Sequence, residues 1–374
     1  MSVRIVPVDK KGELKDFIKF PWFIYRKYWP DYNWVPPLKK DMKFKLDTEK
    51  HPFWKHAERE LFLAYDGLRL VGRIGAIIDH NYNELWDEKM GAFGFFECIN
   101  DQEVANALFD AAANWLKDKG MTFIRGPLSP SMNDECAFLV EGFDKPPTVM
   151  MPYNPKYYPE LAEGAGFAKA KDLLAFYKNA ETGIPERLQK LAEALKNKPN
   201  VKIRKINFKD MHNEMVIIKD LYNKSWEKNW GFSPMTDEEM DLMGKELKPI
   251  AVPELALLVF VNGKPAGIGV TIPNYNQVLK HLDGKLGPIQ IAKALWYRRK
   301  INGVRAMVFG FKPQFRRTGL PILLYLETEQ AGRRLGYKWC ELSWNLEDND
   351  PINKFDSEIG GEVYKRYRIY EREI

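Results

Sequence analysis

The sequence of 374 residues contains few of the side chains that crosslink a chain or bind a metal: it has three cysteines and five histidines. Three widely spaced cysteines, an odd number, argue against a disulfide framework and favour a reducing, cytoplasmic location. The histidines have no metal-ligand spacing with each other or with cysteine. We therefore expect neither structural disulfides nor a metal site.

Long hydrophobic runs are absent as well. The most apolar run, 256–261, is far shorter than the roughly 20 residues that a membrane-spanning helix needs. The first residues lack a cationic head followed by an apolar stretch, so we expect no signal peptide. The net charge of +6 is mild for this length. Because the lysines are dispersed and no nucleic-acid-binding module is recognisable, we expect no nucleic-acid partner.

The sequence does contain an internal repeat. Residues 61–77 and 257–272 each hold two β-rich runs, joined at Asp66-Gly67 and at Asn262-Gly263, and such pairs are typical of β-hairpin turns. Downstream of each hairpin the pattern predicts a helix, a strand, and a glycine-containing step into a last strand. The helices are expected at 101–119 and 320–335, and the strands that follow them at 121–125 and 338–343.

This repeat indicates a duplicated domain, and the length also favours two domains. Both halves mix strands and helices, so we predict the α/β class, with mixed sheets of the α+β kind. We place the domains at 1–178 and 201–374. The segment 179–200, which contains a charged helix, would be the linker.

The most informative stretch is a predicted strand, 307–311, followed by a loop and a helix. The loop holds Arg316, Arg317, Thr318 and Gly319, and the helix begins at Leu320 with a proline in its first turn, where a missing N–H costs nothing. A helix start offers unpaired N–H groups to an anion, and arginine adds donors for phosphate oxygens. The pattern indicates an anion site, or alternatively a polar turn capped by Thr318.

The residues from Arg316 to Pro321 resemble the Arg/Gln-x-x-Gly-x-Gly/Ala signature of the GNAT superfamily of acyl-CoA-dependent N-acyltransferases, with Pro321 in place of the last small residue. Residues 341–361 are similar to the second motif of that family, which has a strand, an asparagine, a short helix and glycine before the last strand. Where the family commonly has a tyrosine that protonates the leaving thiolate, this chain has Asp356. Tyr364 and Tyr367 are possible substitutes.

The resemblance implies an N-acyltransferase that takes an acyl group from acyl-CoA, without a metal, and passes it to a small-molecule or lipid amine. Glu341 would accept the amine proton and Tyr364 would act as the acid. An exposed carboxylate paired with a lysine or arginine is the alternative for Glu341, and simple helix capping is the alternative for Asn349. Residues implied in coenzyme A binding are Phe309, Phe311, Arg316, Arg317, Thr318, Gly319, Leu320 and Asn349, the strand 307–311 through its backbone.

The first half matches the family in the order of its elements but lacks the phosphate loop. It has the acidic turn 100–104 there, which would repel pyrophosphate, so we expect no coenzyme A in this half. The whole chain resembles tandem-GNAT bacterial proteins related to proteins implicated in bacterial ceramide synthesis. A non-catalytic acyl-CoA or lipid sensor, and a tRNA-dependent aminoacyl transferase, are the alternative functions.

Three other stretches have two interpretations each. The aromatic segment 17–34 contains lysine and arginine, and is either an interfacial segment in peripheral contact with a membrane or a helix packed on the sheet. The loop with Ser131 and Asn133 lines the acceptor cleft or is a turn. The insertion that opens at Asn274 and Tyr275 and ends near 304 is expected to contain a helix that covers the acceptor site, unless it is decorative.

Overall fold

The computed structural model describes residues 3–28, 30 and 33–374. Trp29, in the aromatic segment, lies outside the described residues. The chain divides into two units. Unit 1 consists of Met1–Leu173, Val278–Trp296 and Lys365–Ile374, and unit 2 of Leu174–Gln277 and Tyr297–Tyr364. The expected domains, 1–178 and 201–374 with the linker 179–200 between them, stay a prediction.

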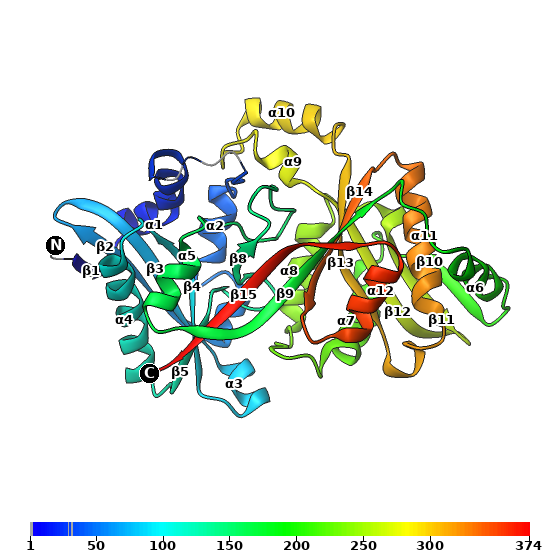
Figure 1. Cartoon of the computed structure of the whole chain (residues 1–374), viewed down its shortest axis with the longest axis horizontal. Helices are drawn as coiled ribbons and strands as arrows, with labels where there is room; N and C mark the ends of the chain where they lie inside the picture. The colour runs from blue at the N-terminus through cyan, green and yellow to red at the C-terminus, as the bar shows by residue number, and fades with distance from the viewer. Residues whose placement is uncertain (1–2, 29, 31–32) are drawn as a thin grey trace. The chain divides into compact units, whose positions relative to one another are not determined.

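Unit 1 is built on a sheet of strand order β1-β2-β3-β4-β5-β15, to which β15 contributes its end (Figure 1). Neighbouring strands are antiparallel except β4 and β5, which are parallel. Tyr370 of β15 lies opposite Gly126 of β5. The strands of this sheet are β1 (Val3–Pro7), β2 (Ala57–Asp66), β3 (Arg69–Asp79), β4 (Met90–Cys98), β5 (Phe123–Gly126) and β15 (Glu362–Glu373).

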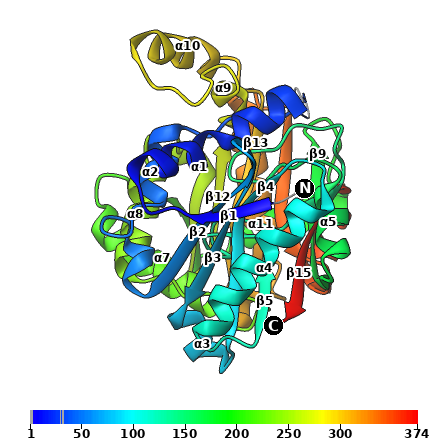
Figure 2. The same ribbon diagram turned by 90° about the vertical axis from the view of Figure 1, so that its left-hand side faces the viewer.

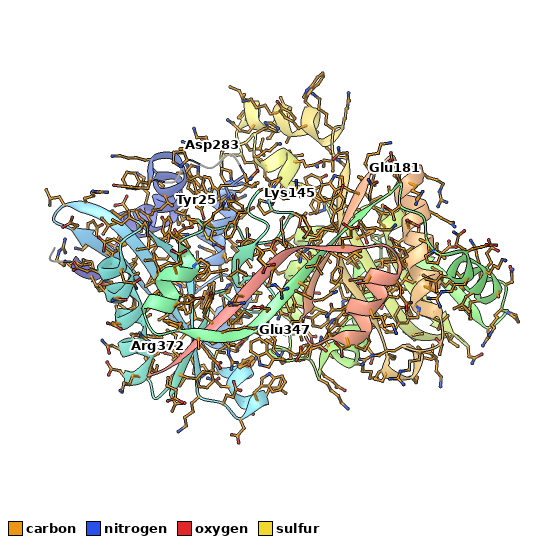
Figure 3. The ribbon with its side chains drawn as sticks, viewed as in Figure 1. Tyr25, Lys145, Glu181, Asp283, Glu347 and Arg372 are labelled. Atoms are coloured by element: carbon orange, nitrogen blue, oxygen red, sulfur yellow. The ribbon has the colours of Figure 1, made fainter. Side chains whose placement is uncertain are left out.

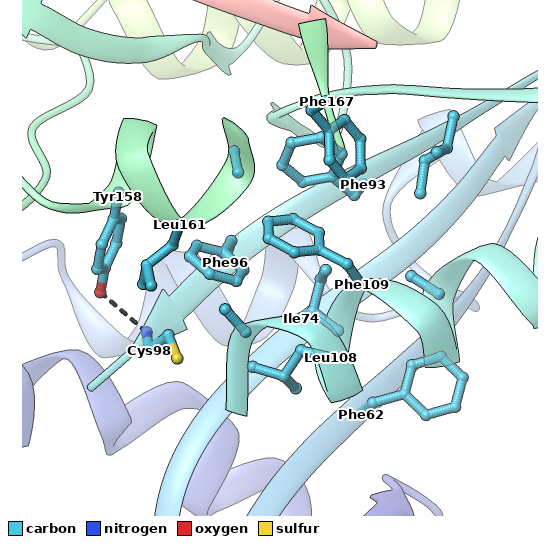
Figure 4. Packing of buried hydrophobic residues seen from close by; sticks show 14 of the residues in the cluster. Phe62, Ile74, Phe93, Phe96, Cys98, Leu108, Phe109, Tyr158, Leu161 and Phe167 are labelled. Atoms are coloured by element: carbon cyan, nitrogen blue, oxygen red, sulfur yellow. Dashed lines mark hydrogen bonds between the residues drawn. The ribbon is translucent and has the colours of Figure 1, made fainter. Parts of the chain in front are cut away.

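Helix α4 (Gln102–Asp118) packs its apolar stripe on this sheet and closes the main core of unit 1. Figure 4 shows Phe93, Phe96 and Phe109 in contact there, and the N–H of Cys98 donates to the hydroxyl of Tyr158 at 3.0 Å. The other elements of unit 1 are α1 (Lys11–Phe23), α2 (Lys39–Lys45), α3 (His80–Trp86), β6 (Leu128–Ser129), β7 (Glu135–Cys136), β8 (Phe138–Glu141), α5 (Tyr158–Gly164), most of α10 (Pro288–Arg298) and parts of β9 (Ala168–Asn179) and α9 (Asn276–Leu279).

Unit 2 has the strand order β9-β14-β13-β12-β11-β10, of which β13 and β14 are parallel. Helices α6 and α11 belong to the buried cluster on one face, and α7 to the cluster on the other. Its elements are β10 (Val201–Lys205), β11 (Ala256–Val261), β12 (Lys264–Pro273), β13 (Gly303–Phe311), β14 (Trp339–Leu346), α6 (Glu186–Lys196), α7 (Met211–Trp226), α8 (Asp237–Leu247), α11 (Leu320–Arg334) and α12 (Asp350–Glu358).

The predicted repeat is confirmed element by element. Strands β2 and β3 form the first hairpin and β11 and β12 the second, and both turn glycines, Gly67 and Gly263, have a positive φ that suits such a turn. Each hairpin is followed by a strand, a long helix and a second strand parallel to the first. The predicted α/β class with mixed sheets is therefore correct.

The aromatic segment is mostly core. Helix α1 begins at Lys11, and the side chains of Phe17, Phe20, Trp22 and Tyr25 are buried within unit 1. Of the two interpretations of this segment, the structure therefore supports the packed helix. Within the described residues, no helix is both long and apolar enough to cross a membrane, and no three His, Cys, Asp or Glu side chains cluster to hold a metal ion.

Candidate active site

The loop before α11 exposes backbone donors at the start of the helix. Gly319 is the N-cap residue, with a φ of 80°, and no side chain caps the helix. The hydroxyl of Thr318 donates instead to the carbonyl of Phe315 at 2.8 Å, so Thr318 closes the polar turn before the helix and does not cap α11 itself. Among the described residues, no acceptor is found for the N–H groups of Arg317, Gly319 and Leu320. This helix start is open to an anion.

The two arginines of the loop, Arg316 and Arg317, differ in the contacts that their side chains make. Arg316 donates through Nε to the carbonyl of Phe311 at 3.1 Å and through Nη2 to the carbonyl of Ser225 at 2.9 Å, so it ties the loop to β13 and α7. The side chain of Arg317 is exposed beside the open N–H groups. Arg316 therefore holds the loop in place, although its side chain is exposed like that of Arg317, and the role of both arginines in coenzyme A binding stays a prediction.

Gly319 is required by two features of the loop. Its positive φ is strained for other residues, and a Cβ here would lie 2.8 Å from Leu195 and 3.1 Å from Leu191 of α6. The space next to this Cα is therefore filled by the linker helix. The approach of α6 is a steric reason for glycine that the sequence pattern did not indicate, and the role of Gly319 in coenzyme A binding stays a prediction.

Strand β13 leaves its final residues unpaired on one side. Its parallel pairing with β14 ends at Ala306 opposite Leu342, and residues 308–311 pair only with β12 in the described chain. Met307 is an extra residue in that ladder, since Val270 lies opposite Val308 and Thr271 opposite Ala306. Such a bulge redirects backbone groups, so this edge offers N–H and C=O groups to an extended ligand.

The two residues proposed for proton transfer lie in contact. The hydroxyl of Tyr364 donates to Oε2 of Glu341, and the hydroxyl of Ser343 donates to Oε1 at 2.6 Å. Arg305 in turn donates from Nε to Ser343 Oγ at 3.0 Å. Glu341 is 0% exposed, so the alternative of an exposed carboxylate is wrong. A buried carboxylate held by two hydroxyls lies one residue from the point where β13 and β14 separate.

Sequence reasoning missed Arg305 and Ser343. Both belong to the layer of Glu341: Arg305 lies opposite it in the parallel ladder, and Ser343 is two residues along the same strand. The period-2 alternation of a strand places Glu341 and Ser343 on one face and was the signal that could have found the serine. The arginine requires the register of β13 against β14, which no single-strand pattern contains.

Asp356, at the position where the resembled family has a tyrosine, is buried on α12. Its Oδ2 accepts from the side-chain amide of Asn345 at 2.8 Å. Burial raises the pKa of this carboxyl to about 7, against the smaller lowering effect of Asn345. Asp356 is therefore partly protonated near neutral pH, which distinguishes it from an ordinary surface aspartate.

The remaining residues implied in coenzyme A binding are Phe309, Phe311 and Asn349. Phe311 is buried, and Phe309 stacks on Phe355 of α12 with ring centroids 5.6 Å apart. The side chains of Phe309 and Phe311 are therefore engaged in packing, and a ligand would contact these two residues through their backbone. Asn349 is the N-cap residue of α12, but its side chain makes no capping hydrogen bond. Glu347, labelled in Figure 3, lies just after β14.

The residues predicted to bind the acceptor are divided between the units. Ser131 and Asn133 belong to unit 1, where the serine hydroxyl donates to Asp134 at 3.0 Å and accepts from the N–H of Asn133 at 3.1 Å. Asn274 and Tyr275 belong to unit 2, and the buried side chain of Asn274 accepts from the N–H of Asn276 at 3.3 Å. Their role in binding stays a prediction.

Unit 1 contains the same framework, but its own side chains occupy it. The carboxylate of Asp101 accepts from the N–H groups of Glu103 and Val104 at the start of α4. Strand β4 also has a bulge, and there Ser129 Oγ of β6 accepts the N–H of Phe95 at 3.0 Å. A Cβ on Gly94 would lie 1.7 Å from the carbonyl oxygen of Leu128, so β6 lies tightly against β4.

Two known bacterial proteins are similar to this chain over nearly its whole length. No protein-family profile matches the chain. It is 37% identical to the bacterial ceramide synthase of Caulobacter vibrioides, over 100% of this chain and 98% of that protein. It is 36% identical to the protein YghO of Escherichia coli, over 97% and 94%.

Among solved structures, a tandem GNAT protein from the clavulanic acid biosynthesis pathway superposes with a TM-score of 0.57 at 12% identity, covering 100% of this chain and 98% of that one. At that identity the likeness shows the fold alone, and the fold is the tandem GNAT fold that the sequence motifs predicted. The identity to the two bacterial relatives extends over nearly the full length of each chain. The chain therefore belongs to the family of the Caulobacter bacterial ceramide synthase and YghO, whose fold here is that of a tandem GNAT protein.

Proposed function

We propose that the protein is an N-acyltransferase that transfers a long acyl chain from acyl-CoA to a long-chain amine. The observation that carries this proposal is in unit 2, where an open helix start, a half-paired bulged strand and the buried Glu341–Tyr364 pair occur together. The GNAT fold supports acyl transfer in general. The long-chain substrate class is supported by the relative named a bacterial ceramide synthase, because a ceramide is a long-chain amino alcohol whose nitrogen is joined to a fatty acyl group as an amide.

The residues of unit 2 fit coenzyme A as the acyl carrier. The N–H groups of Arg317, Gly319 and Leu320 and the exposed guanidinium of Arg317 would hold the pyrophosphate. The unpaired edge of β13 from Met307 onward would pair with the amides of the pantetheine arm. A backbone N–H at the bulge would then stabilise the oxyanion of the thioester carbonyl.

The proton path follows from the contact between Glu341 and Tyr364. The amine nitrogen attacks the thioester carbonyl, its proton passes to Glu341, and the C–S bond breaks as the amide forms. The thiolate takes the proton of Tyr364, and Glu341 returns the amine proton to the phenolate through the hydrogen bond that joins the two residues. Arg305, through Ser343, holds the carboxylate in position.

Turnover with a series of acyl donors tests the proposal. Thiol release and amide product are measured for acetyl-CoA to palmitoyl-CoA with a long-chain amino alcohol as acceptor and with no acceptor. Since each buried methylene contributes roughly 0.8 kcal/mol, we expect kcat/KM to rise roughly 15-fold for each pair of carbons until the acyl chain no longer gains buried surface. A flat series contradicts the long-chain class. Binding of acyl-CoA without any amide product contradicts the proposed acyltransferase activity and indicates a non-catalytic sensor.

A further inference from the structure

We propose that helix α10, with the residues that flank it, is a docking surface for a bilayer that contains anionic phospholipid. Its apolar residues point outward. Leu286, Ile289, Ile291, Leu295 and Trp296 are 49% to 69% exposed, and no residue of α10 is buried. Of the eleven large hydrophobic residues that are exposed in the described chain, these five lie within one short segment.

The face of α10 that is turned toward the protein is the smaller and more polar one. Gln290, Ala294 and Tyr297 are half-buried, and their spacing of four and three residues places them on one side of the helix. Ile289, Ala292, Leu295 and Trp296 follow the same spacing on the other side and are exposed. A helix of a globular protein normally has the reverse orientation, with its apolar stripe on the core. An exposed apolar patch of this kind marks an interaction site.

The charge of the segment identifies the partner. Between Gly284 and Gly303 the sequence contains five cationic residues and no acidic residue; the cations are Lys285, Lys293, Arg298, Arg299 and Lys300. Apolar and aromatic side chains bordered by lysine and arginine suit the boundary of an anionic membrane. A second copy of the chain fits poorly, because a two-fold contact through this helix would bring these cations together.

The base of this helix is fixed, so the surface is presented in a defined way. Asp283, labelled in Figure 3, accepts from the indole N–H of Trp22 at 2.9 Å and pairs with Arg26 of unit 1. The N–H of Lys39 donates to the carbonyl of Gly284 at 3.1 Å. Beyond this anchor, α10 stands away from the strands of unit 1 in both views (Figures 1 and 2). This anchor also neutralises Asp283, the nearest acidic group before the cationic segment.

Co-sedimentation of the full-length protein with vesicles tests this surface. Phosphatidylcholine vesicles are compared with and without phosphatidylglycerol, and no acyl-CoA or amine is added. We expect binding to the anionic vesicles, and a loss of at least about tenfold in the double variant Leu295→Glu, Trp296→Glu. Neutralising Arg298 or Arg299 should weaken binding roughly fivefold for each cation removed.

Leu68→Glu is the matched control, because Leu68 is 99% exposed at a hairpin turn of unit 1 and undergoes the same chemical change. Melting curves should show every variant folded, since each altered side chain is exposed. Absence of binding to anionic vesicles, equal binding by the double variant, or a dimer on gel filtration that Leu295→Glu dissociates would each overturn the proposal. The assay contains no substrate, so its failure leaves the acyl-transfer proposal untouched.

Discussion

The two units have the same strand, bulge and helix start; side chains fill them in unit 1, whereas the described residues leave them open in unit 2. In unit 1 the Asp101 carboxylate satisfies the first N–H groups of α4, whereas α11 in unit 2 begins at Gly319 without a side-chain cap. Ser129 of β6 occupies the bulge of β4 at Phe95. In the described part of unit 2, no strand equivalent to β6 lies between β13 and β14.

In unit 1, two side chains are enough to fill the helix start and the bulge that unit 2 leaves open. A single carboxylate supplies the negative charge that an anionic ligand would bring to a helix start. One serine on a two-residue strand supplies the acceptor that a ligand amide would bring to the bulge. The inference that unit 1 binds no coenzyme A now has two physical reasons, of which the sequence indicated only the acidic turn.

The largest effect is expected on turnover, from substitution of Glu341 in unit 2. Glu341→Gln keeps the size of the side chain and removes the proton acceptor, so kcat should fall roughly 10²–10⁴-fold. Coenzyme A affinity, measured by calorimetry, should change little because Glu341 contacts Ser343 and Tyr364 rather than the loop. Ser343→Ala is the positioning control: it should lower kcat less and shift the pH profile. A Glu341→Gln enzyme with nearly normal turnover would remove this residue from the mechanism.

A smaller effect is expected on ligand affinity at the open helix start. Arg317→Glu should weaken coenzyme A binding about 10- to 100-fold, since a charge-assisted hydrogen bond contributes about 1.5–3 kcal/mol. This exposed residue is a cleaner test than Arg316, which holds two backbone carbonyls, or Gly319, where a side chain would collide with α6. Unchanged affinity would show that the loop does not hold the pyrophosphate.

A third experiment tests whether unit 1 can bind coenzyme A once its acidic turn is neutralised. In the Arg317→Glu background, Asp101→Asn with Glu103→Gln removes the acidic turn of unit 1 while Ser129 still fills the bulge. We expect no new coenzyme A binding by calorimetry. The full chain is required, because β5 pairs with residues 370–373 of β15, which a piece ending at 178 would lack. Binding regained in this variant would mean that charge alone had closed unit 1.

Local patterns predicted the elements, and only tertiary contacts revealed how they are used. Some features have a signature within a few neighbouring residues and could be predicted from the sequence. They are the hairpin turns at Gly67 and Gly263 and the loop before α11. The hydrogen bond from Arg316 to the carbonyl of Ser225 and the insertion of Ser129 into a bulge depend on partners distant in sequence. The outward apolar face of α10 was missed for a related reason: periodicity identifies an apolar stripe but not the side it faces.

The smallest effect concerns stability and again separates the units. Burial raises the pKa of Glu97 in unit 1, and that of Asp356 in unit 2, to about 7. Between the unfolded value near 4 and about 7, each folded carboxyl keeps a proton that the unfolded chain has lost. The free energy of unfolding therefore falls as pH rises through this window, by roughly 1.4 kcal/mol per pH unit for each group.

The neutral variants should respond in opposite ways. Asp356→Asn removes the charge beside an amide partner, so denaturation curves above pH 7 should show a gain of stability and a flatter pH profile. Above pH 7, where Glu97 is ionised, Glu97→Gln leaves Arg73, whose Nη2 lies 3.7 Å from Glu97 Oε1, as a buried cation without that carboxylate, so the variant should lose stability there. If both variants shifted stability in the same direction, the arginine would not be what separates the two sites.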